Sequence, residues 1–421
     1  MVNGAGKMML RGLIRPAVLA AALVAGGASF AASPASAPAP ATCRTVGTFD
    51  AWLDRFRQEA LAQGISRRTL AEAAPYLTYD QRIVNIDRGQ RVFSLSFIDF
   101  ANRILPPSRL AAGEAHMRKY ATLFARAEKE YGVPASVITA FWGLESDYGS
   151  NMGNDNSLRS IATLAYDCRR SDMFREHLLY SLRIIERGDL APAEMIGSWA
   201  GELGQTQMMP REYFEYAVDY DGDGHRNLLR SPADVIGSTA NYLVHLGWKR
   251  GQPWLQEVRV PQNLPWQETG LDIKHPRSQW AKWGVAYPDG HALPHDGLQA
   301  SVLLPMGRFG PAFMVYDNFQ VYLQWNNSLV YSTTAAYFAT RLDGAPAMQK
   351  PSSAVPPVTM EMTKELQQNL IRLGFDVGGA DGKLGLATRQ AVKAMQVKLG
   401  LPADSYPTEE LLERLRQTKA R

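Results

Sequence analysis

The segment Val133-Pro-Ala-Ser-Val-Ile-Thr-Ala-Phe-Trp-Gly-Leu-Glu-Ser-Asp-Tyr-Gly149 is the most informative part of the chain. Its apolar residues recur with helical spacing, and Pro134 suits the first turn of a helix, where a missing N–H costs nothing. Val137, Phe141 and Glu145 stand four residues apart, so they share one face of that helix. The pattern predicts a helix that places a carboxylate on an apolar face and ends at the final glycine.

That placement gives Glu145 the chemistry of an acid. Burial disfavours the charged form of a carboxylate, so we expect the pKa of Glu145 to be raised. A carboxylic acid that stays protonated near neutral pH can protonate the leaving oxygen of a glycosidic bond. The spacing alone also fits a glutamate that is salt-bridged at a helix terminus.

The composition is that of a globular protein with a sizeable core. The chain has 421 residues, 46% hydrophobic and 20% charged, which suggests about three structural units. Its net charge of +4 comes without a polybasic run, so nucleic acid is not an expected partner. The two cysteines, Cys43 and Cys168, are too few for a disulfide-rich domain or a cysteine-only zinc site.

The N-terminus predicts export. Three basic residues precede an uncharged apolar run, Pro16–Phe30, which is nearer in length to a signal-peptide core than to a membrane span. We therefore expect residues 1–32 to be a cleaved signal peptide and the mature chain to be periplasmic without a transmembrane anchor; the alternative is an uncleaved anchor. In that oxidising compartment Cys43 and Cys168 could form a disulfide, or remain two separate thiols.

Composition shifts divide the mature chain. A spacer rich in Pro, Ala and Ser occupies 33–47, a mostly helical unit 48–345, a Pro-rich linker 346–358, and a compact module 359–416. Within the large unit the patterns predict helices and short strands. The expected helices are Leu110–Tyr131, Phe174–Ile185 and Asp234–Leu246, and the expected strands are Gln299–Leu304 and Phe319–Leu323.

Two motifs carry a family resemblance. Glu145-Ser-Asp-Tyr-Gly149 resembles the Glu-Ser-x-x-Gly motif of lysozyme-like lytic transglycosylases, and Ser198-Trp-Ala-Gly-Glu-Leu-Gly-Gln-Thr-Gln-Met-Met-Pro210 resembles their second motif. Together they make the chain similar to the membrane-bound lytic murein transglycosylase B family. The resemblance implies a mainly α protein with a lysozyme-like (α+β) catalytic core, an additional helical subdomain and a small three-helix C-terminal module.

The resemblance also implies an activity. A lytic transglycosylase cleaves the β-1,4 bond between N-acetylmuramic acid and N-acetylglucosamine in peptidoglycan and leaves 1,6-anhydromuramoyl ends. Glu145 would act as both acid and base, and no cofactor would be needed for the chemistry. Asp147 lies off its helix face, whereas Glu202 stays a candidate second carboxylate. A hydrolytic muramidase and a non-catalytic peptidoglycan-binding scaffold are the alternatives.

Further residues match positions of the family motifs that contact sugars. Ser198 and Gln207 match polar residues that contact N-acetyl and hydroxyl groups. Trp199 and Tyr242 match aromatic groove positions, and aromatic faces suit the CH-rich faces of sugar rings. For each of these residues, packing in the core is the alternative interpretation.

The late segment Val321-Tyr-Leu-Gln-Trp-Asn-Asn-Ser-Leu-Val-Tyr331 matches a motif around an active-site asparagine. The resemblance implies that Asn326, flanked by Trp325 and Tyr331, stabilises an oxocarbenium-like transition state. Arg169 and Arg170 match a paired-arginine motif suited to the carboxylates of the muramoyl peptide.

An acidic loop predicts a structural calcium ion. Asp219-Tyr-Asp221-Gly-Asp223-Gly224 fits the opening of an EF-hand loop, in which alternate carboxylates converge on one cation. His225 would contribute its backbone carbonyl, and Asp234 would close a longer loop, because Arg230 occupies the usual place of the last glutamate. The family resemblance implies such an expanded site; the alternative is an Asp/Gly turn stabilised by its own backbone.

The C-terminal module resembles the peptidoglycan-binding domain that is often fused to wall hydrolases. Its Leu366, Leu370 and Phe375 have core spacing on any interpretation, so binding is implied by the resemblance and not by the residues. The alternative is a degenerate copy that only packs on the catalytic unit. Peptidoglycan glycan strands are thus the expected partner, and the sequence identifies no protein partner.

Overall fold

The computed structural model describes residues 47–89, 95–350 and 354–419. The predicted signal peptide, nearly all of the spacer, and Cys43 lie outside these residues, so the signal peptide and the disulfide to Cys168 stay predictions. Among the described residues no helix is long and apolar enough to cross a membrane.

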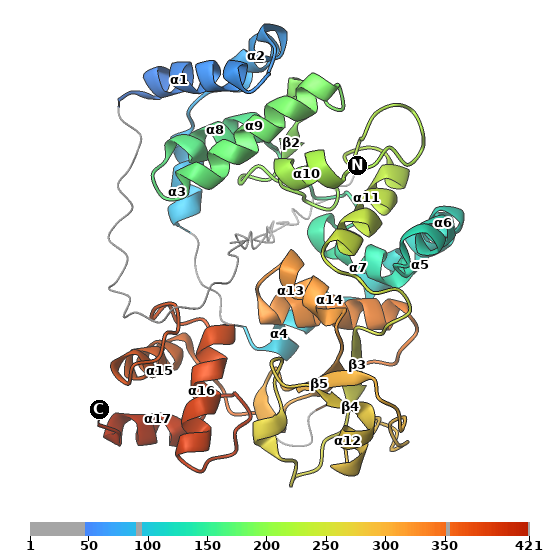
Figure 1. The fold of residues 1–421 in the computed structure, drawn as a ribbon, viewed down its shortest axis with the longest axis vertical. Helices are drawn as coiled ribbons and strands as arrows, with labels where there is room; N and C mark the ends of the chain where they lie inside the picture. The colour runs from blue at the N-terminus through green and yellow to red at the C-terminus, as the bar shows by residue number, and fades with distance from the viewer. Residues whose placement is uncertain (1–46, 90–94, 351–353, 420–421) are drawn as a thin grey trace, which may run out of the picture.

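One group of helices, at the top of Figure 1, is built around the long α9, which contacts α2, α8 and α10. Local signals set the helix ends: Thr48 caps α1 and Ser66 caps α2 through their side-chain oxygens. The helices are α1 (Phe49–Ala62), α2 (Arg67–Ala73), α3 (Gln81–Arg88), α8 (Ser157–Tyr166), α9 (Ser171–Arg187) and α10 (Pro210–Tyr216), with two short 3₁₀ turns at Ala74–Tyr76 and Pro192–Glu194.

A second group of helices surrounds α7 (Ala135–Ser146), which contacts α5, α6, α11 and α14. Because α7 is buried on nearly every side, most of its residues are apolar or small. The other helices of this group are α4 (Phe97–Ile104), α5 (Pro107–Lys119), α6 (Ala121–Tyr131), α11 (Pro232–His245), α13 (Phe319–Trp325) and α14 (Leu329–Leu342).

A four-stranded antiparallel sheet lies below α14 in the view of Figure 1, with the strand order β3-β6-β5-β4. Alternate residues of its strands face two different apolar clusters: Phe313 and Val315 join the large helical core, whereas Ala312 and Met314 pack with Trp280 on the other face. The strands are β3 (Leu255–Val258), β4 (His275–Pro276), β5 (Gln299–Leu303) and β6 (Ala312–Val315). Beside them lie α12 (Arg277–Lys282) and 3₁₀ turns at Trp266–Glu268 and Gly307–Phe309. A separate two-stranded pair joins β1 (Asp155–Asn156) to β2 (Ile196–Gly197).

Three local predictions were wrong. The segment expected as one helix from Leu110 to Tyr131 is two helices, because the backbone leaves the helical region at Tyr120. The expected strand Phe319–Leu323 is helix α13, since a short buried apolar run does not distinguish a strand from a buried helix. Helix α7 ends at Ser146 and not at Gly149, because Asp147 already has a left-handed conformation with φ of 53°.

The C-terminal module is a three-helix unit, as predicted, with its own small apolar core. Its helices are α15 (Met360–Arg372), α16 (Leu386–Lys398) and α17 (Glu409–Gln417). Buried Arg389 of α16 donates to the carbonyl of Pro305 (2.5 Å) in the sheet subdomain, and Arg308 of that subdomain donates to the buried Asp404 (3.1 Å). The module is therefore docked on the large unit.

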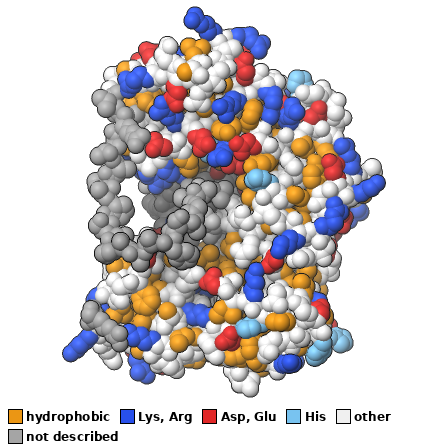
Figure 2. Space-filling model, viewed as in Figure 1, with side chains coloured by type: hydrophobic (Ala, Val, Ile, Leu, Met, Phe, Trp, Pro, Cys, Tyr) orange, Lys and Arg blue, Asp and Glu red, His pale blue; other side chains and the backbone are white. Residues whose placement is uncertain are grey.

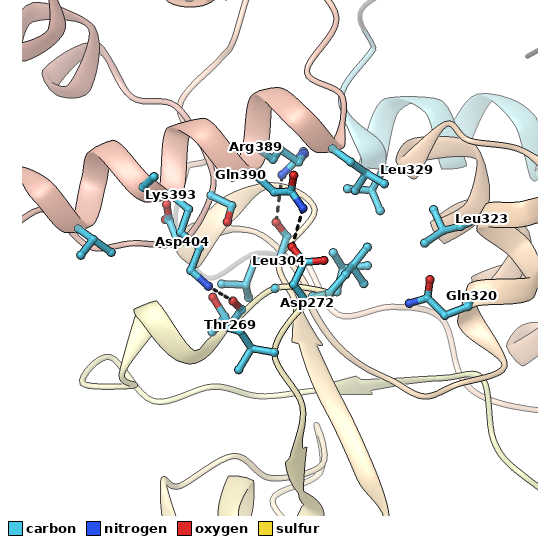
Figure 3. A pocket seen from close by; sticks show the side chains of 18 residues that line it. Thr269, Asp272, Leu304, Gln320, Leu323, Leu329, Arg389, Gln390, Lys393 and Asp404 are labelled. Atoms are coloured by element: carbon cyan, nitrogen blue, oxygen red, sulfur yellow. Dashed lines mark hydrogen bonds between the residues drawn. The ribbon is translucent and has the colours of Figure 1, made fainter. Parts of the chain in front are cut away.

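A cavity of about 710 Å³ lies along this contact (Figure 3). Lys393 donates to the carbonyl of Thr269 across it, and Gln390 donates to Asp272 (2.6 Å). Leu323 and Leu329, from the two helices that flank Asn326, form another wall. The module, the sheet and the α13–α14 corner thus meet at one place.

Candidate active site

Glu145 lies in the last turn of α7, beside the corner between α13 and α14. Phe141, one turn earlier, packs on Trp325 with ring centroids 4.3 Å apart. Both Trp325 and Tyr331 reach the same carboxylate oxygen of Glu145, Oε1: the indole Nε1 donates at 2.9 Å, and the Tyr331 hydroxyl also donates. Two distant parts of the chain therefore converge on Glu145. The predicted substrate contacts of Trp325 and Tyr331 stay predictions.

The environment of Glu145 favours the protonated form. Burial is the largest cause and raises the pKa of Glu145 to about 7, although the hydrogen bonds from Tyr331 and Trp325 oppose it. The negative charge of Glu202 raises the pKa further. Among the described residues, both donors reach Oε1, so Oε2 is the oxygen that can carry the proton toward a substrate. This arrangement is suited to general acid–base catalysis near neutral pH.

The turn after α7 fixes the end of the helix. Asp147 and Tyr148 both have positive φ, and the Ser146 hydroxyl accepts the N–H of Gly149 at 2.8 Å. Asp147 is exposed and ion-paired with Arg109 at 3.1 Å. Asp147 is therefore occupied outside the Glu145 contacts, in agreement with its predicted position off the helix face.

Ser198 lies in a tight loop that faces α7. Its side chain is 5% exposed, donates its hydroxyl proton to the carboxylate of Glu202, and accepts the N–H of Ala200 at 3.1 Å. Gly197 is required in this loop, because a Cβ there would lie 1.9 Å from the backbone oxygen of Glu202. The loop thereby holds Ser198 and Glu202 together.

Gln207 has a left-handed backbone, and its side-chain amide donates to the carbonyls of Gly204 (2.8 Å) and Met152 (3.3 Å). These bonds give Gln207 a structural role in the loop and leave its side-chain oxygen as the group that could contact a sugar. The predicted substrate contact stays a prediction.

Aromatic rings continue from Trp325 toward α10. Tyr242 is 7% exposed, lies 5.3 Å from Trp325 and stacks on Tyr216 at 5.1 Å. Trp199 is half-buried and packs against the main core. The structure places Tyr242 beside the Trp325–Glu145 pair, while a sugar contact by either residue stays a prediction.

Asn326 begins the turn between α13 and α14 and is 6% exposed. Its side-chain oxygen accepts the N–H of Ser328 at 2.9 Å, and its backbone oxygen accepts the Ser332 hydroxyl. Because the oxygen is occupied, the amide NH₂ is the part of this side chain that is available to a substrate.

Arg169 and Arg170 share a partner that the sequence analysis missed. The carboxylate of Asp87 is 1% exposed and accepts two hydrogen bonds from Arg169, at 2.7 and 2.8 Å, and one from Arg170. One buried negative charge thus binds two guanidinium groups, so the three residues together carry a net charge of one positive unit. Binding of peptide carboxylates stays a prediction for Arg169, whose side chain is half-exposed.

Gln205 was also missed. Its side-chain oxygen accepts the indole N–H of Trp142 (2.8 Å) on α7, and its amide donates to the carbonyl of Leu229 (3.0 Å). It therefore ties α7 to the Ser198 loop and to the acidic loop. The only sequence signal was its position inside the second motif, where polar residues are expected to contact substrate instead.

The acidic loop brings three of the predicted calcium ligands together. The carboxylates of Asp219, Asp221 and Asp223 lie within 4.8 Å of one another. Asp219 also accepts the backbone N–H groups of Gly222 (2.7 Å) and Gly224 (2.8 Å), which curls the loop around it. Convergent carboxylates in a curled loop fit a hard cation such as Ca²⁺.

Two other predicted ligands have different contacts. The Asp234 carboxylate is buried and accepts the N–H groups of Tyr220 and Asn227, both at 2.7 Å, so it clamps the two ends of the loop. The imidazole of His225 contacts the carbonyl of Gly188 at 2.9 Å, which agrees with the expectation that its ring is not a ligand. Asp234 is not part of the three-carboxylate cluster.

On the face shown in Figure 2, basic and acidic side chains are interspersed. This distribution agrees with the absence of a polybasic run in the sequence.

Comparison with known proteins places this geometry in a family. The family model described as Transglycosylase SLT domain matches residues 48–340. The chain belongs to the transglycosylase SLT family. A peptidoglycan binding domain model matches residues 359–415. Among curated relatives of the family, the membrane-bound lytic murein transglycosylase B of Escherichia coli (strain K12) is 32% identical over 241 residues. The match covers 56% of this chain and 64% of that relative, so it spans less than two thirds of the relative's length.

Solved structures of the family confirm the predicted lysozyme-like, mainly helical fold. SltB3 from Pseudomonas aeruginosa, in complex with NAG-anhNAM-pentapeptide, is 42% identical with a TM-score of 0.81, over 88% of this chain and 99% of that one. Escherichia coli Slt35, in complex with calcium, is 28% identical with a TM-score of 0.58, over 69% and 92%.

Proposed function

We propose that the protein is a periplasmic lytic transglycosylase that cleaves the β-1,4 bond between N-acetylmuramic acid and N-acetylglucosamine in peptidoglycan. The observation that carries the proposal is Glu145, a desolvated carboxyl with two donors on one oxygen and a pKa raised to about 7. Membership of the transglycosylase SLT family and the names of the relatives support the same reaction.

In the proposed reaction Glu145 acts twice. Its Oε2 proton passes to the glycosidic oxygen as the bond from that oxygen to C1 of the muramoyl sugar breaks. The resulting carboxylate then takes the proton of the C6 hydroxyl, whose oxygen forms the new bond to C1. The carboxyl regains its proton, no water is consumed, and the product ends in a 1,6-anhydro ring. One carboxylate suffices because the nucleophile belongs to the substrate.

Other side chains would bind the sugars and hold the catalytic acid in position. Tyr331 holds Glu145 in position, and the free amide N–H groups of Asn326 are suited to hydrogen-bond an oxygen of the sugar. Because the charge that develops at C1 is positive, these N–H groups would help by positioning the sugar and not by contact with C1 itself. We assign the remaining sugar contacts to Ser198, Gln207, Trp199, Tyr242 and Trp325, and the peptide carboxylates to Arg169 and Arg170.

The replacement of Glu145 by Gln tests the assignment. Loss of the acid and base should reduce lysis of purified sacculi by about 10²–10⁴-fold. Asp147→Asn is the matched control, since it neutralises a nearby acid that is paired with Arg109 outside the site, and it should keep activity. Undiminished lysis by Glu145→Gln would refute the proposal.

A hydrolytic muramidase is the second candidate, because the charge of Glu202 acts on Glu145 and Glu202 would be the second carboxylate that a hydrolase uses. Against it, Oε2 of the Glu202 carboxylate already accepts the Ser198 hydroxyl. Mass spectrometry of the released muropeptides distinguishes the two: anhydro ends are lighter by one water than the reducing ends of a muramidase. Binding without any turnover by the intact protein would instead support the scaffold alternative.

A further inference from the structure

Glu202 is a carboxylate that contacts a serine hydroxyl and not a basic side chain. It is partly buried behind Ser198, and within the described part of the chain it makes no salt bridge. Burial raises the pKa of Glu202, and the hydrogen bond from its side-chain partner, the Ser198 hydroxyl, and the positive charge of Arg170 oppose that rise. Arg170 is itself fixed by the buried Asp87, so the positive charge behind Glu202 is held in place.

The hydrogen bonds of Ser198 restrict what it can offer a substrate. A hydroxyl has one proton to donate and two lone pairs that can accept. The proton goes to Glu202, and one lone pair accepts the Ala200 N–H at 3.1 Å. One lone pair remains, so Ser198 can meet a ligand only as an acceptor of an N–H or O–H group.

The same carboxylate is linked to the catalytic acid. The charge of Glu202 disfavours ionisation of Glu145 and so acts in the same direction as burial. The groups that bear on Glu145 are Tyr331, Trp325 and Glu202, and those that bear on Glu202 are Ser198 and Arg170. Glu202 therefore acts on Ser198 through a hydrogen bond and on Glu145 through its charge.

We propose that Glu202 is a positioning residue that binds the hydroxyl proton of Ser198, so that Ser198 presents a lone pair to an N–H or O–H donor of the sugar. The acetamido N–H and the ring hydroxyls of the N-acetylated glycan are donors of this class. The proposal rests on the proposed function, because it assigns the selectivity of the same site. Removal of Glu202 frees the Ser198 proton and lets the hydroxyl rotate, which weakens binding of the donor.

A double-mutant cycle tests whether Glu202 acts through Ser198. The variants are Ser198→Ala, Glu202→Ala and the double replacement, assayed by cleavage of a soluble muroglycan tetrasaccharide. Each single replacement should raise KM about tenfold, the effect of one hydrogen bond. Because the two residues form one unit, the double variant should be no worse than Ser198→Ala. Losses that multiply to about a hundredfold, or an unchanged KM in Glu202→Ala, would overturn the proposal.

Glu202→Gln separates positioning from charge. Its side-chain oxygen can still accept the Ser198 hydroxyl, so KM should stay within about threefold of the wild-type value. Its lost negative charge should move the basic limb of kcat to lower pH, because Glu145 ionises more readily. A tenfold rise in KM together with an unmoved limb would contradict the assignment, since a merely structural carboxylate would give that result.

The control is Glu186→Gln. Glu186 likewise accepts a serine hydroxyl, that of Ser66 at 2.8 Å, but it lies on α9 at the cap of α2. This variant should leave KM and the pH profile unchanged. If the wild-type protein does not cleave the tetrasaccharide, the proposed function fails. A second outcome is that the wild-type protein cleaves it, Glu145→Gln is inactive, and Glu202→Ala keeps the wild-type KM. In that case only the positioning role of Glu202 fails.

Binding of the tetrasaccharide, measured without turnover, also compares protein with and without the Glu202 carboxylate. In the Glu145→Gln background, calorimetry with the tetrasaccharide should show about tenfold weaker binding when Glu202→Ala is added. Equal affinities would count against the proposal. Circular dichroism of each variant establishes that the fold is intact.

Discussion

Replacement of Tyr331 by Phe should move the pH dependence of the enzyme upward. The Tyr331 hydroxyl donates to Oε1 of Glu145 and so stabilises the ionised carboxylate. A hydrogen bond to a charged group contributes about 1.5–3 kcal/mol, and one pKa unit corresponds to about 1.36 kcal/mol. The bond is therefore worth about 1–2 units at most. The Trp325 bond remains and water can replace part of the loss, so we expect a rise of about one unit from the wild-type pKa of about 7.

The sign follows from the role of Glu145 as an acid. The protonated form of Glu145 is the active acid, and it is present below the pKa of Glu145 and lost as pH rises through that pKa. A higher pKa extends activity to higher pH, and the basic limb should shift upward by about one unit. At neutral pH the rate should fall several-fold, since the acid is weaker.

The assay is the initial rate of muropeptide release from sacculi between about pH 5 and 9. Tyr337→Phe is the matched control, because Tyr337 lies on the same helix and its hydroxyl accepts the N–H of Met348 at 3.0 Å instead. A basic limb in Tyr331→Phe that coincides with the wild-type limb, or that moves to lower pH, would show that Glu145 is not the titrating acid.

Three further outcomes are expected. Calcium at about 100 times its dissociation constant should raise the free energy of unfolding by about 2.7 kcal/mol, measured by thermal unfolding. Asp223→Asn should abolish this stabilisation by calcium, because Asp223 belongs to the three-carboxylate cluster. Asp289→Asn, at an exposed aspartate outside the cluster, should keep it. Arg389→Ala, which removes the bond to Pro305, should weaken module docking on the order of 3 kcal/mol and speed proteolytic cleavage in the linker. Arg372→Ala, whose carbonyl contacts lie inside the module, should leave the linker protected. Gly143→Ala places a Cβ 2.6 Å from the Tyr148 hydroxyl and should lower stability by about 1–3 kcal/mol, whereas Gly297→Ala, with open space around it, should not; calorimetric unfolding that ranks the two alike would contradict this packing argument.

A local rule predicted that Glu145 lies on an apolar helix face, but the same spacing also fitted a salt-bridged glutamate, so the role of acid came from the family resemblance. Glu145 stands at helical spacing from Phe141, and the burial that raises its pKa follows from that spacing. The convergence of Trp325 and Tyr331 on Glu145 could not come from spacing, since 180 and 186 residues separate the partners. The family resemblance implied only that Trp325 and Tyr331 flank Asn326 and bind the substrate, so their contact with Glu145 is a finding of the structure.

The missed contacts have a common physical cause. Asp87 is an isolated acid in a helix pattern, and nothing near it in the sequence indicates the arginines 82 and 83 residues away. Gln205 could bind sugar or protein equally well by chemistry, and only its contact with Trp142 decides. The error at Phe319–Leu323 arose because its five residues are too few to show a period.

The docked C-terminal module changes what a second binding unit can contribute. A unit on a loose tether searches a volume and raises the local concentration of every ligand within reach. Arg389 and Asp404 instead fix the module against the sheet subdomain. A fixed pair of sites favours only ligands whose own spacing matches the gap and excludes the rest. A wall-binding site on this docked module would therefore select glycan strands by their spacing, in addition to keeping the protein near the wall.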